Sequence, residues 1–230
     1  ESIRLLRTNL LFATAGQETD TFVVTSANPQ EGKSTTVNYL GASLAAMGEK
    51  RVVVIDTDLH RPMLHRAYGL PNNKGVSNVI IGDVAVEDVT QATDIENVDV
   101  ITSGPIPPNS AELLAYPKFE QMVERLREHY DWLILDSPPV NALSDALVLS
   151  RLAHAVLLVV QPQKTDRGAL RHAVRQLHNI DAPLAGFIFN GVQEQKRRGY
   201  YGLGGYYSYT RYGYYYRRPY YEQDGGAAGT

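Results

Sequence analysis

The chain contains no cysteine, so neither disulfide bonds nor a thiolate metal centre can stabilise it. This absence fits a reducing compartment. The six histidines are scattered without the spacing of metal ligands, and we interpret them as surface or core residues. No run of apolar residues approaches the roughly 18 that span a membrane, and we expect no secretory signal peptide in this sequence. The composition, with 43% hydrophobic and 20% charged residues among 230, is instead that of a globular protein large enough for one α/β domain.

Residues 27–34, Ala-Asn-Pro-Gln-Glu-Gly-Lys-Ser, lie between an apolar strand pattern and a helix pattern. In this setting the Gly-Lys-Ser turn predicts a phosphate-binding loop, in which backbone N–H groups and the positive end of a helix face an anion. Lys33 can reach nucleotide phosphates, and the Ser34 hydroxyl can bind Mg²⁺. Ala27 departs from the usual pattern, because it stands where the first glycine belongs. The three-residue signal is weak alone, but its position favours a nucleotide site over an ordinary turn.

Two further strand patterns end in carboxylates. Asp56 and Asp58 follow one buried strand pattern, and Asp136 ends another. Such carboxylates are unfavourable unless a positive group meets them. One of the first pair could cap the following turn, but Mg²⁺, a lysine or a substrate proton explains them better at the carboxyl edge of an α/β sheet. Asp136 could hold Mg²⁺ opposite Ser34.

Strand patterns alternate with helix patterns along the chain, which predicts a mostly parallel sheet flanked by helices. We therefore expect an α/β fold of the three-layer, P-loop NTPase-like kind. The predicted strands cover residues 21–25, 51–55, 98–102, 130–136, 155–160 and 183–189, and the longer helices 35–47, 118–129, 143–152 and 166–178. Residues 59–98 indicate short helices and loops. The chain divides into a helix (1–15), the α/β domain (16–195) and a tail (196–230).

The predicted site residues should meet at one edge of the sheet, because each follows the carboxyl end of a strand. They would supply a phosphate cradle, a metal and a carboxylate near the attacking group, which are the parts that phosphoryl transfer needs. A tyrosine hydroxyl, with a pKa of about 10, would need a carboxylate to orient it and accept its proton. Either Asp56 or Asp58 could do this, and the sequence leaves the choice open.

The tail differs from the rest of the chain in both charge and aromatic content. It holds 11 of the 15 tyrosines, and its six basic residues against two acidic ones give +4, while residues 1–195 carry −7. Its few aliphatic residues predict disorder, and its charge favours a substrate segment drawn to an acidic site. Each phosphate would add roughly −1.5 to −2 charges, so a few would reverse the attraction. The alternative is a nucleic-acid-binding tail, because Arg and Tyr are interspersed in it.

Residues 1–13 predict an amphipathic helix whose apolar stripe is formed by Ile3, Leu6 and Leu10. Beside this stripe, at a spacing of three residues, lie Glu1, Arg4 and Arg7. A helix that packs on the domain with a charged edge in solvent explains this spacing. A contact with carboxylates of another subunit is the alternative that the arginines allow.

Together these features resemble the cytoplasmic kinase domain of bacterial tyrosine kinases (BY-kinases), the polysaccharide co-polymerase type that governs capsule and exopolysaccharide export. Residues 27–34 resemble its Walker A loop, 53–58 its Walker A′ motif and 133–136 its Walker B motif. Residues 104–114 resemble a family segment that normally has Pro where Ser110 stands. Glu1, Arg4 and Arg7 match the E-x-x-R-x-x-R motif, and the tail resembles the family's tyrosine cluster. The resemblance covers essentially the whole chain.

The resemblance implies an autokinase that uses ATP and Mg²⁺ and forms a ring whose subunits phosphorylate each other's tails. By this likeness Lys33, Asp56, Asp58 and Asp136 are catalytic, with Asp58 the preferred base, and Ser34, Asp56 and Asp136 bind the metal ion. The implied nucleotide-binding residues are Asn28, Gln30, Glu31, Gly32, Lys33, Ser34, Thr35 and Asn190, the last at the adenine. The implied phosphoacceptors are Tyr200, Tyr201, Tyr206, Tyr207, Tyr209, Tyr212, Tyr214, Tyr215, Tyr216, Tyr220 and Tyr221.

The likeness also implies partners and a location. Glu1, Arg4 and Arg7 would mediate the ring, a transmembrane activator would be fused or separate, and a tyrosine phosphatase would act on the tail. We expect no nucleic-acid partner and a position at the cytoplasmic face of the bacterial inner membrane. His60 stands where the family often has Arg, so the contacts with the substrate are the part of the resemblance that this departure affects.

Two other functions are compatible with parts of the sequence. A ParA/MinD-type ATPase has the same fold, but usually carries Lys where Asn28 stands and lacks a tyrosine tail. A catalytically inactive co-polymerase partner would have a decayed site, whereas the lysine, serine and aspartates are all intact here.

Overall fold

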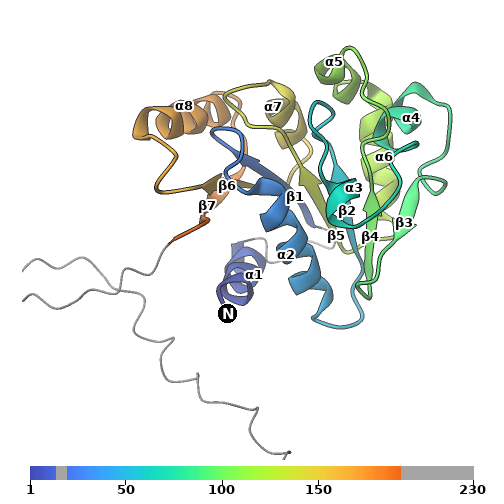
Figure 1. Ribbon diagram of the computed structural model, residues 1–230, viewed down its shortest axis with the longest axis horizontal. Coiled ribbons are helices and arrows are strands. Elements are labelled where there is room, and N and C mark those ends of the chain that lie inside the picture. The colour runs from blue at the N-terminus through green and yellow to red at the C-terminus, as the bar shows by residue number, and fades with distance from the viewer. Residues whose placement is uncertain (14–19, 193–230) are drawn as a thin grey trace, which may run out of the picture. The chain divides into compact units, whose positions relative to one another are not determined.

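The computed structural model describes residues 1–13 and 20–192 of the chain. The tyrosine cluster lies outside these residues. Within them a seven-stranded sheet has the order β3-β4-β2-β5-β1-β6-β7 (Figure 1). Its strands are β1 (Asp20–Ser26), β2 (Val52–Asp56), β3 (Thr90–Ala92), β4 (Val98–Ile101), β5 (Trp132–Asp136), β6 (Ala155–Val160) and β7 (Leu184–Phe189). Only the β3–β4 pair is antiparallel among the described strands, so the predicted mostly parallel sheet is confirmed.

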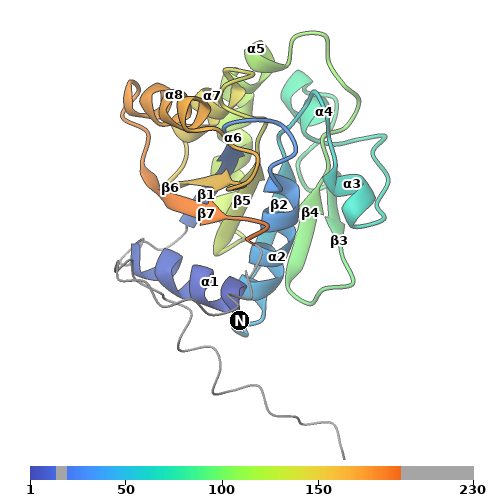
Figure 2. The same ribbon diagram turned by 60° about the vertical axis from the view of Figure 1, so that its left-hand side comes forward.

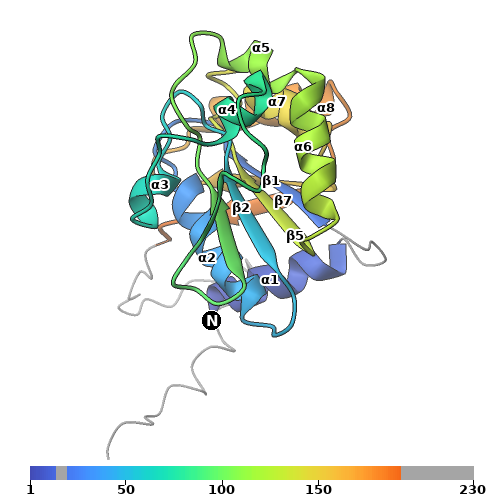
Figure 3. The same cartoon turned by 90° about the vertical axis from the view of Figure 1, so that its right-hand side faces the viewer.

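Helices cover both faces of this sheet, as Figures 2 and 3 show. One face carries α1 (Ser2–Ala13), α2 (Lys33–Ala45) and α3 (Leu64–Ala67). The opposite face carries α4 (Val76–Ile81), α5 (Ser110–Leu114), α6 (Pro117–Arg127), α7 (Asp145–Ser150) and α8 (Arg167–His178). The predicted three-layer architecture is therefore confirmed.

The central strands are apolar on both faces because each face meets a helical layer. In β2, Val52 and Val54 belong to the core cluster beneath α1 and α2, whereas Val53 and Ile55 belong to the cluster beneath α4–α8. All four side chains are fully buried. A continuous apolar run is the expected pattern for a parallel strand covered on both sides.

The apolar stripe of α1 is its buried side. Leu10 is 2% exposed and lies in the core cluster beneath α2, with Ile3 and Leu6 packed against that cluster. Arg7 donates a hydrogen bond from Nη1 to the Ser43 carbonyl oxygen, at 2.6 Å, near the carboxyl end of α2. A cation at this end of a helix is favourable because the helix dipole is negative there.

Strand β3 was not predicted. Its three residues, Thr-Gln-Ala, are half-buried or exposed and carry no apolar alternation. The strand forms because β4 presents a free edge, to which β3 pairs antiparallel from Thr90 to Ala92.

Within the described part of the chain, no helix has the length and apolar character that a membrane span requires.

We expect Leu10→Ala to lower the free energy of unfolding by about 2–4 kcal/mol, because it leaves a cavity between α1 and the sheet. Leu5 lies on the same helix but is 61% exposed, so Leu5→Ala should change the value by less than about 0.5 kcal/mol. Urea denaturation of both variants measures the difference. Equal effects at the two positions would show that α1 does not pack as described.

Candidate functional site

The predicted site residues meet at the carboxyl edge of the sheet, as parallel pairing requires. Asp56 and Asp136 are direct register partners on β2 and β5, and Asp136 also pairs with Val24 of β1. The loop of residues 27–32 leaves the end of β1, and Lys33 opens α2. Asn190 follows the last residue of β7 at the same edge.

Two residues of the loop have left-handed backbone, Gln30 with φ 61° and Gly32 with φ 94°. A Cβ on Gly32 would lie 1.9 Å from Asn190 Nδ2, so the close approach also requires glycine. Ala27 is not among the described residues with positive φ, and its side chain is fully buried. Glycine is therefore unnecessary at position 27, which explains the departure from the usual pattern.

Glu31 braces the loop from inside. Its side chain is fully buried, and its carboxylate accepts hydrogen bonds from the Asn28 amide N–H (3.0 Å), Asn28 Nδ2 (3.2 Å) and Thr165 Oγ1 (2.6 Å). Asn190 Nδ2 donates to the Glu31 carbonyl oxygen at 3.0 Å. These contacts hold the loop in shape through Asn190, which follows β7, and Thr165, which precedes α8.

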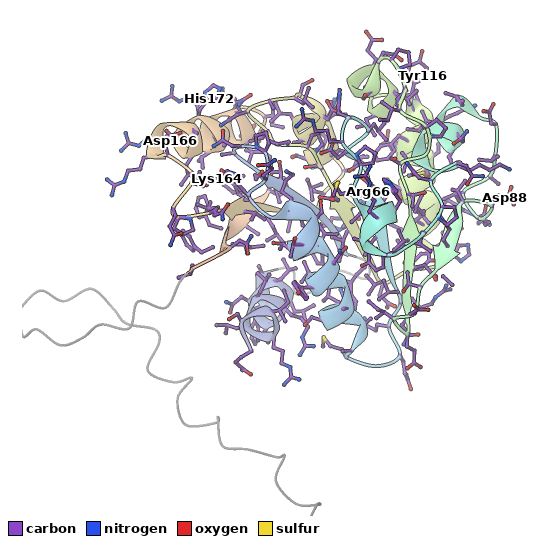
Figure 4. The ribbon with its side chains drawn as sticks, viewed as in Figure 1. Arg66, Asp88, Tyr116, Lys164, Asp166 and His172 are labelled. Carbon is purple, nitrogen blue, oxygen red and sulfur yellow. The ribbon has the colours of Figure 1, made fainter. Side chains whose placement is uncertain are left out.

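Lys164, which also precedes α8, donates from Nζ to the Gln30 carbonyl oxygen at 3.1 Å (Figure 4). The strained backbone of Gln30 is thus held by a side chain from a different part of the chain. Thr35, by contrast, is exposed on the first turn of α2.

Asp56 and Asp136 are 0% and 1% exposed, yet each has one oxygen without a hydrogen-bond partner among the described residues, Oδ1 in both cases. The other oxygen of Asp56 accepts the backbone N–H groups of Met63 (3.0 Å) and Leu64 (2.9 Å) at the start of α3. Buried carboxylate oxygens are normally satisfied, so two orphans side by side are suited to a hard cation.

The charges at this edge are unbalanced. Burial raises the pKa of Asp56 well above its usual range, and the neighbouring Asp136 raises it further. Burial likewise raises the pKa of Asp136 to about 7, against the opposing effects of the Ser34 hydrogen bond and of Lys33. Burial lowers the pKa of Lys33, while Asp136 and Asp58 oppose that shift. One buried lysine therefore faces several carboxylates, and an additional cation would relieve their repulsion.

The described residues contain no group of three or more His, Asp or Glu side chains placed to hold a metal ion without further ligands. An ion at Asp56 and Asp136 would therefore need the Ser34 hydroxyl, water or phosphate oxygens as well. This is the usual donor set for Mg²⁺, which rarely occupies an all-protein cage.

Asp58 lies outside the buried pair and is half-buried. Its Oδ1 accepts the backbone N–H groups of His60 (3.2 Å) and Arg61 (2.9 Å). The His60 imidazole in turn lies with Nε2 3.2 Å from Asp145 Oδ2 at the start of α7, and the Asp145 side chain is fully buried. Burial raises the pKa of Asp145, and His60 counters that shift. The loop that carries Asp58 is thus tied to α7.

Sequence reasoning missed Asp145, Thr165 and Lys164. No motif marks them, because each acts on a residue distant in the chain. Tyr68 was also missed: its hydroxyl is buried without a hydrogen-bond partner among the described residues. Burial, reinforced by Asp136, raises the pKa of Tyr68 to about 12. Arg4 and Arg7 lie apart from this site, on α1, and Glu1 immediately precedes that helix; Glu1 and Arg4 are exposed.

Comparison with known proteins identifies close relatives. The family described as AAA domain matches residues 28–184. The tyrosine-protein kinase YwqD of Bacillus subtilis is 38% identical over 204 residues, which cover 88% of this chain and 86% of that protein. The kinase domain of the Escherichia coli tyrosine kinase Etk matches with a TM-score of 0.80 and 33% identity, over 89% of this chain and 79% of that one. The chimerical protein CapA2B2 matches with a TM-score of 0.79 and 32% identity, over 84% of each chain.

The septum site-determining protein MinD from Pyrococcus horikoshii, solved with Mg-ADP, is more distant. It has 23% identity and a TM-score of 0.61, over 74% of this chain and 70% of that one. At this identity the likeness shows a shared fold alone.

We expect Asp136→Asn to stabilise the protein in the absence of Mg²⁺ and nucleotide, by about 1–3 kcal/mol at pH 8. A carboxyl whose folded-state pKa is raised stabilises the fold when protonated, and this contribution is lost as pH rises from about 4, its unfolded value, through about 7. The advantage of the variant should therefore be smaller at pH 5 than at pH 8.

Urea denaturation at the two pH values measures this difference. Asp88→Asn is the control, because Asp88 is exposed at the margin of the domain (Figure 4). An advantage that is absent at pH 8, or that does not change with pH, would contradict the raised pKa of Asp136.

Proposed function

The chain belongs to the bacterial tyrosine kinases and carries their AAA domain, and we propose that it transfers the γ-phosphoryl group of ATP to the tyrosine cluster of neighbouring copies. The observation that carries this proposal is the convergence of a phosphate loop and three carboxylates at one sheet edge, in a chain whose relatives are named tyrosine-protein kinases.

The nucleotide would occupy the loop between β1 and α2. Gly32 lets the backbone approach Asn190, the preferred adenine contact, and Lys33, at the start of α2, would bind the phosphates. Ser34, Asp56 and Asp136 would hold Mg²⁺, which suits the two orphaned carboxylate oxygens. Bound Mg·ATP would supply the phosphoryl group with its charge partly neutralised. Among the other residues predicted to bind the nucleotide, Gln30, Gly32 and Thr35 are the better candidates for contacts through their backbones. Asn28 and Glu31 are less suited, because they bind each other.

Asp58 is the better candidate for the residue that receives the tyrosine hydroxyl. It is half-buried and can face an incoming side chain, whereas Asp56 is fully buried and its pKa is raised. Two backbone N–H groups fix Asp58 Oδ1, so the carboxylate is oriented before the acceptor arrives. In this role Asp58 orients the hydroxyl and accepts its proton late in the transfer.

The acceptor would be the tail, whose +4 charge favours approach to a carboxylate-lined site. Glu1, Arg4 and Arg7 would join subunits into a ring that presents each tail to a neighbour. The proposal includes a transmembrane activator, fused or separate, at the cytoplasmic face of the membrane. A tyrosine phosphatase would remove the phosphates from the tail. The kinase would thereby control capsule or exopolysaccharide export. The likeness to CapA2B2, a chimera, supports an association with a second protein.

A MinD-like output is less well supported. The Asn28 side chain, at the position where such ATPases usually have Lys, binds Glu31 within its own loop. Asn28 is uncharged, so it cannot present a positive charge to a second subunit, whereas a lysine at this position could.

Transfer between copies can be tested by mixing two variants. One has an intact site but lacks residues 200–230, and the other has the full tail and carries Lys33→Met. With Mg·ATP, and with the activator segment added, we expect phosphotyrosine on the Lys33→Met chain only when the first variant is present. Arg4→Ala in both chains should lower this signal if α1 brings subunits together, because Arg4 is exposed. Immunoblotting measures the signal, and an unlabelled Lys33→Met chain would refute transfer in trans.

We expect His60→Ala to lower kcat about tenfold or more while leaving the KM for ATP within about twofold. The reason is that His60 anchors the Asp58 loop to buried Asp145 without touching the phosphate loop. Asp145→Asn should act in the same direction. His60→Arg should restore the rate, because a guanidinium can also pair with a carboxylate.

His172→Ala is the matched control, since His172 lies exposed on α8 (Figure 4). Steady-state phosphorylation of a tyrosine peptide measures both constants. A normal kcat for His60→Ala, or no recovery with His60→Arg, would show that the contact between His60 and Asp145 does not position Asp58.

A further inference from the structure

A shallow hollow lies between α8 and the edge strand β7, and no residue of the nucleotide site lines it. Its lining residues are Leu170, Arg171, Val174, Arg175, His178 and Phe187. We call this the α8–β7 hollow. Figure 4 shows α8, with His172 labelled, at the margin of the domain, where long nitrogen-tipped side chains extend outward.

The floor of the hollow is apolar. Leu170 and Val174 are half-buried on α8, and the Phe187 ring on β7 is 45% exposed. Strand β7 is the last strand of the sheet, and its residues alternate between half-buried and exposed. An aromatic side chain of a partner could therefore cover apolar surface that the domain itself leaves half open.

The rim of the hollow is basic. Arg171, Arg175 and His178 succeed one another at spacings of four and three residues, so they share one side of α8. Neither arginine takes part in an ion pair among the described residues. From Arg167 to His178 the helix has no acidic residue, although residues 1–195 as a whole carry −7. The rim is thus a local positive surface on a negative domain.

We propose that the α8–β7 hollow binds a phosphotyrosine-bearing segment, presented in trans by a second copy of the chain, with the sequence of residues 200–221. The phenyl ring would lie against Phe187, Leu170 and Val174, and the phosphate would meet the basic rim. Guanidinium groups bind phosphate through two parallel hydrogen bonds, which suits Arg171 and Arg175, neither of which has an ion-pair partner in the described part of the chain. Basic clusters of this kind are a recurrent means of phosphopeptide recognition.

Charge makes this surface selective for the product of the reaction. The unmodified segment of residues 200–221 carries +3, from Arg211, Arg217 and Arg218, and is repelled by the rim. Three phosphates would add roughly −4.5 to −6 charges and make the segment negative. The carboxylate-lined catalytic edge would then favour the unphosphorylated segment, and the basic hollow would favour the phosphorylated one. The proposal rests on the proposed function for the origin of the phosphotyrosine, but the binding itself does not depend on catalysis.

An anionic membrane is the other negative partner that a basic helix could meet. Membrane binding needs apolar side chains that protrude into the lipid, together with basic residues around them. Here the apolar side chains between the arginines are half-buried and form the floor of a hollow, which suits an inserted ring better than a flat lipid surface.

The test uses the full chain without ATP and fluorescent synthetic peptides with the sequence of residues 206–221. One peptide carries three phosphotyrosines, and the other is unmodified. By fluorescence anisotropy we expect the phosphopeptide to bind at least about tenfold more tightly, equivalent to about 1.4 kcal/mol. Arg171→Ala and Arg175→Ala should each weaken that binding about tenfold. Arg167→Ala removes the same charge from the same helix outside the hollow, and it should change the affinity less than about threefold.

Competition identifies the ring contact. Phenyl phosphate should displace the phosphopeptide at lower concentration than inorganic phosphate does, and Phe187→Ala should reduce this preference. Equal binding of both peptides, or equal effects of Arg167→Ala and Arg171→Ala, would overturn the proposal. The proposal would also be overturned if the phosphopeptide did not bind and the chain instead bound phosphatidylserine vesicles in a way that requires Arg171. Because the phosphotyrosines are synthetic, these outcomes do not depend on whether the chain phosphorylates itself.

Discussion

The pairing of β2 with β5 sets the chemistry of this protein, because it places two buried carboxylates side by side. Asp56 and Asp136 are register partners with almost no exposure, and each has one oxygen that no described residue hydrogen-bonds. Burial raises the pKa of each carboxyl, the charge of Asp136 adds to the shift of Asp56, and Lys33 alone does not balance them. The arrangement is unfavourable for the empty domain and favourable for a cation with phosphate ligands. In the proposed function, stability is thereby lower locally at the position where charge would be neutralised during phosphoryl transfer.

The phosphate loop is organised before any ligand arrives. Glu31 lies inside the loop and accepts hydrogen bonds from Asn28 and from Thr165, while Asn190 reaches the Glu31 carbonyl oxygen from the end of β7. Because Thr165 follows β6 and Asn190 follows β7, the loop geometry depends on these neighbouring strands as well as on the loop sequence. A preformed cradle reduces the ordering that nucleotide binding would otherwise require. The tie between His60 and Asp145 orders the Asp58 loop in the same way.

Opposite charges are separated on this domain. Carboxylates gather at the carboxyl edge of the sheet, whereas α8 presents arginines without acidic neighbours on the same helix. In the proposed function, phosphorylation would reverse the sign of the charge on residues 196–230, which carry +4 before reaction. Separate acidic and basic surfaces can then distinguish the segment before and after reaction by electrostatics alone, without a conformational change in the domain.

The sequence by itself determined the mostly parallel sheet, the phosphate loop and the carboxylates at strand ends. Apolar runs such as residues 52–55 report burial on both faces, and the chemistry of Lys33 and Ser34 is local to a few consecutive residues. The tertiary structure alone decided which distant residues support the phosphate loop and complete the sheet. Thr165 lies 134 positions from Glu31, and β3 has no pattern of its own and forms on the open edge of β4. The α8–β7 hollow likewise needs two elements to meet. Such contacts depend on register and packing between distant segments, which local periodicity does not encode.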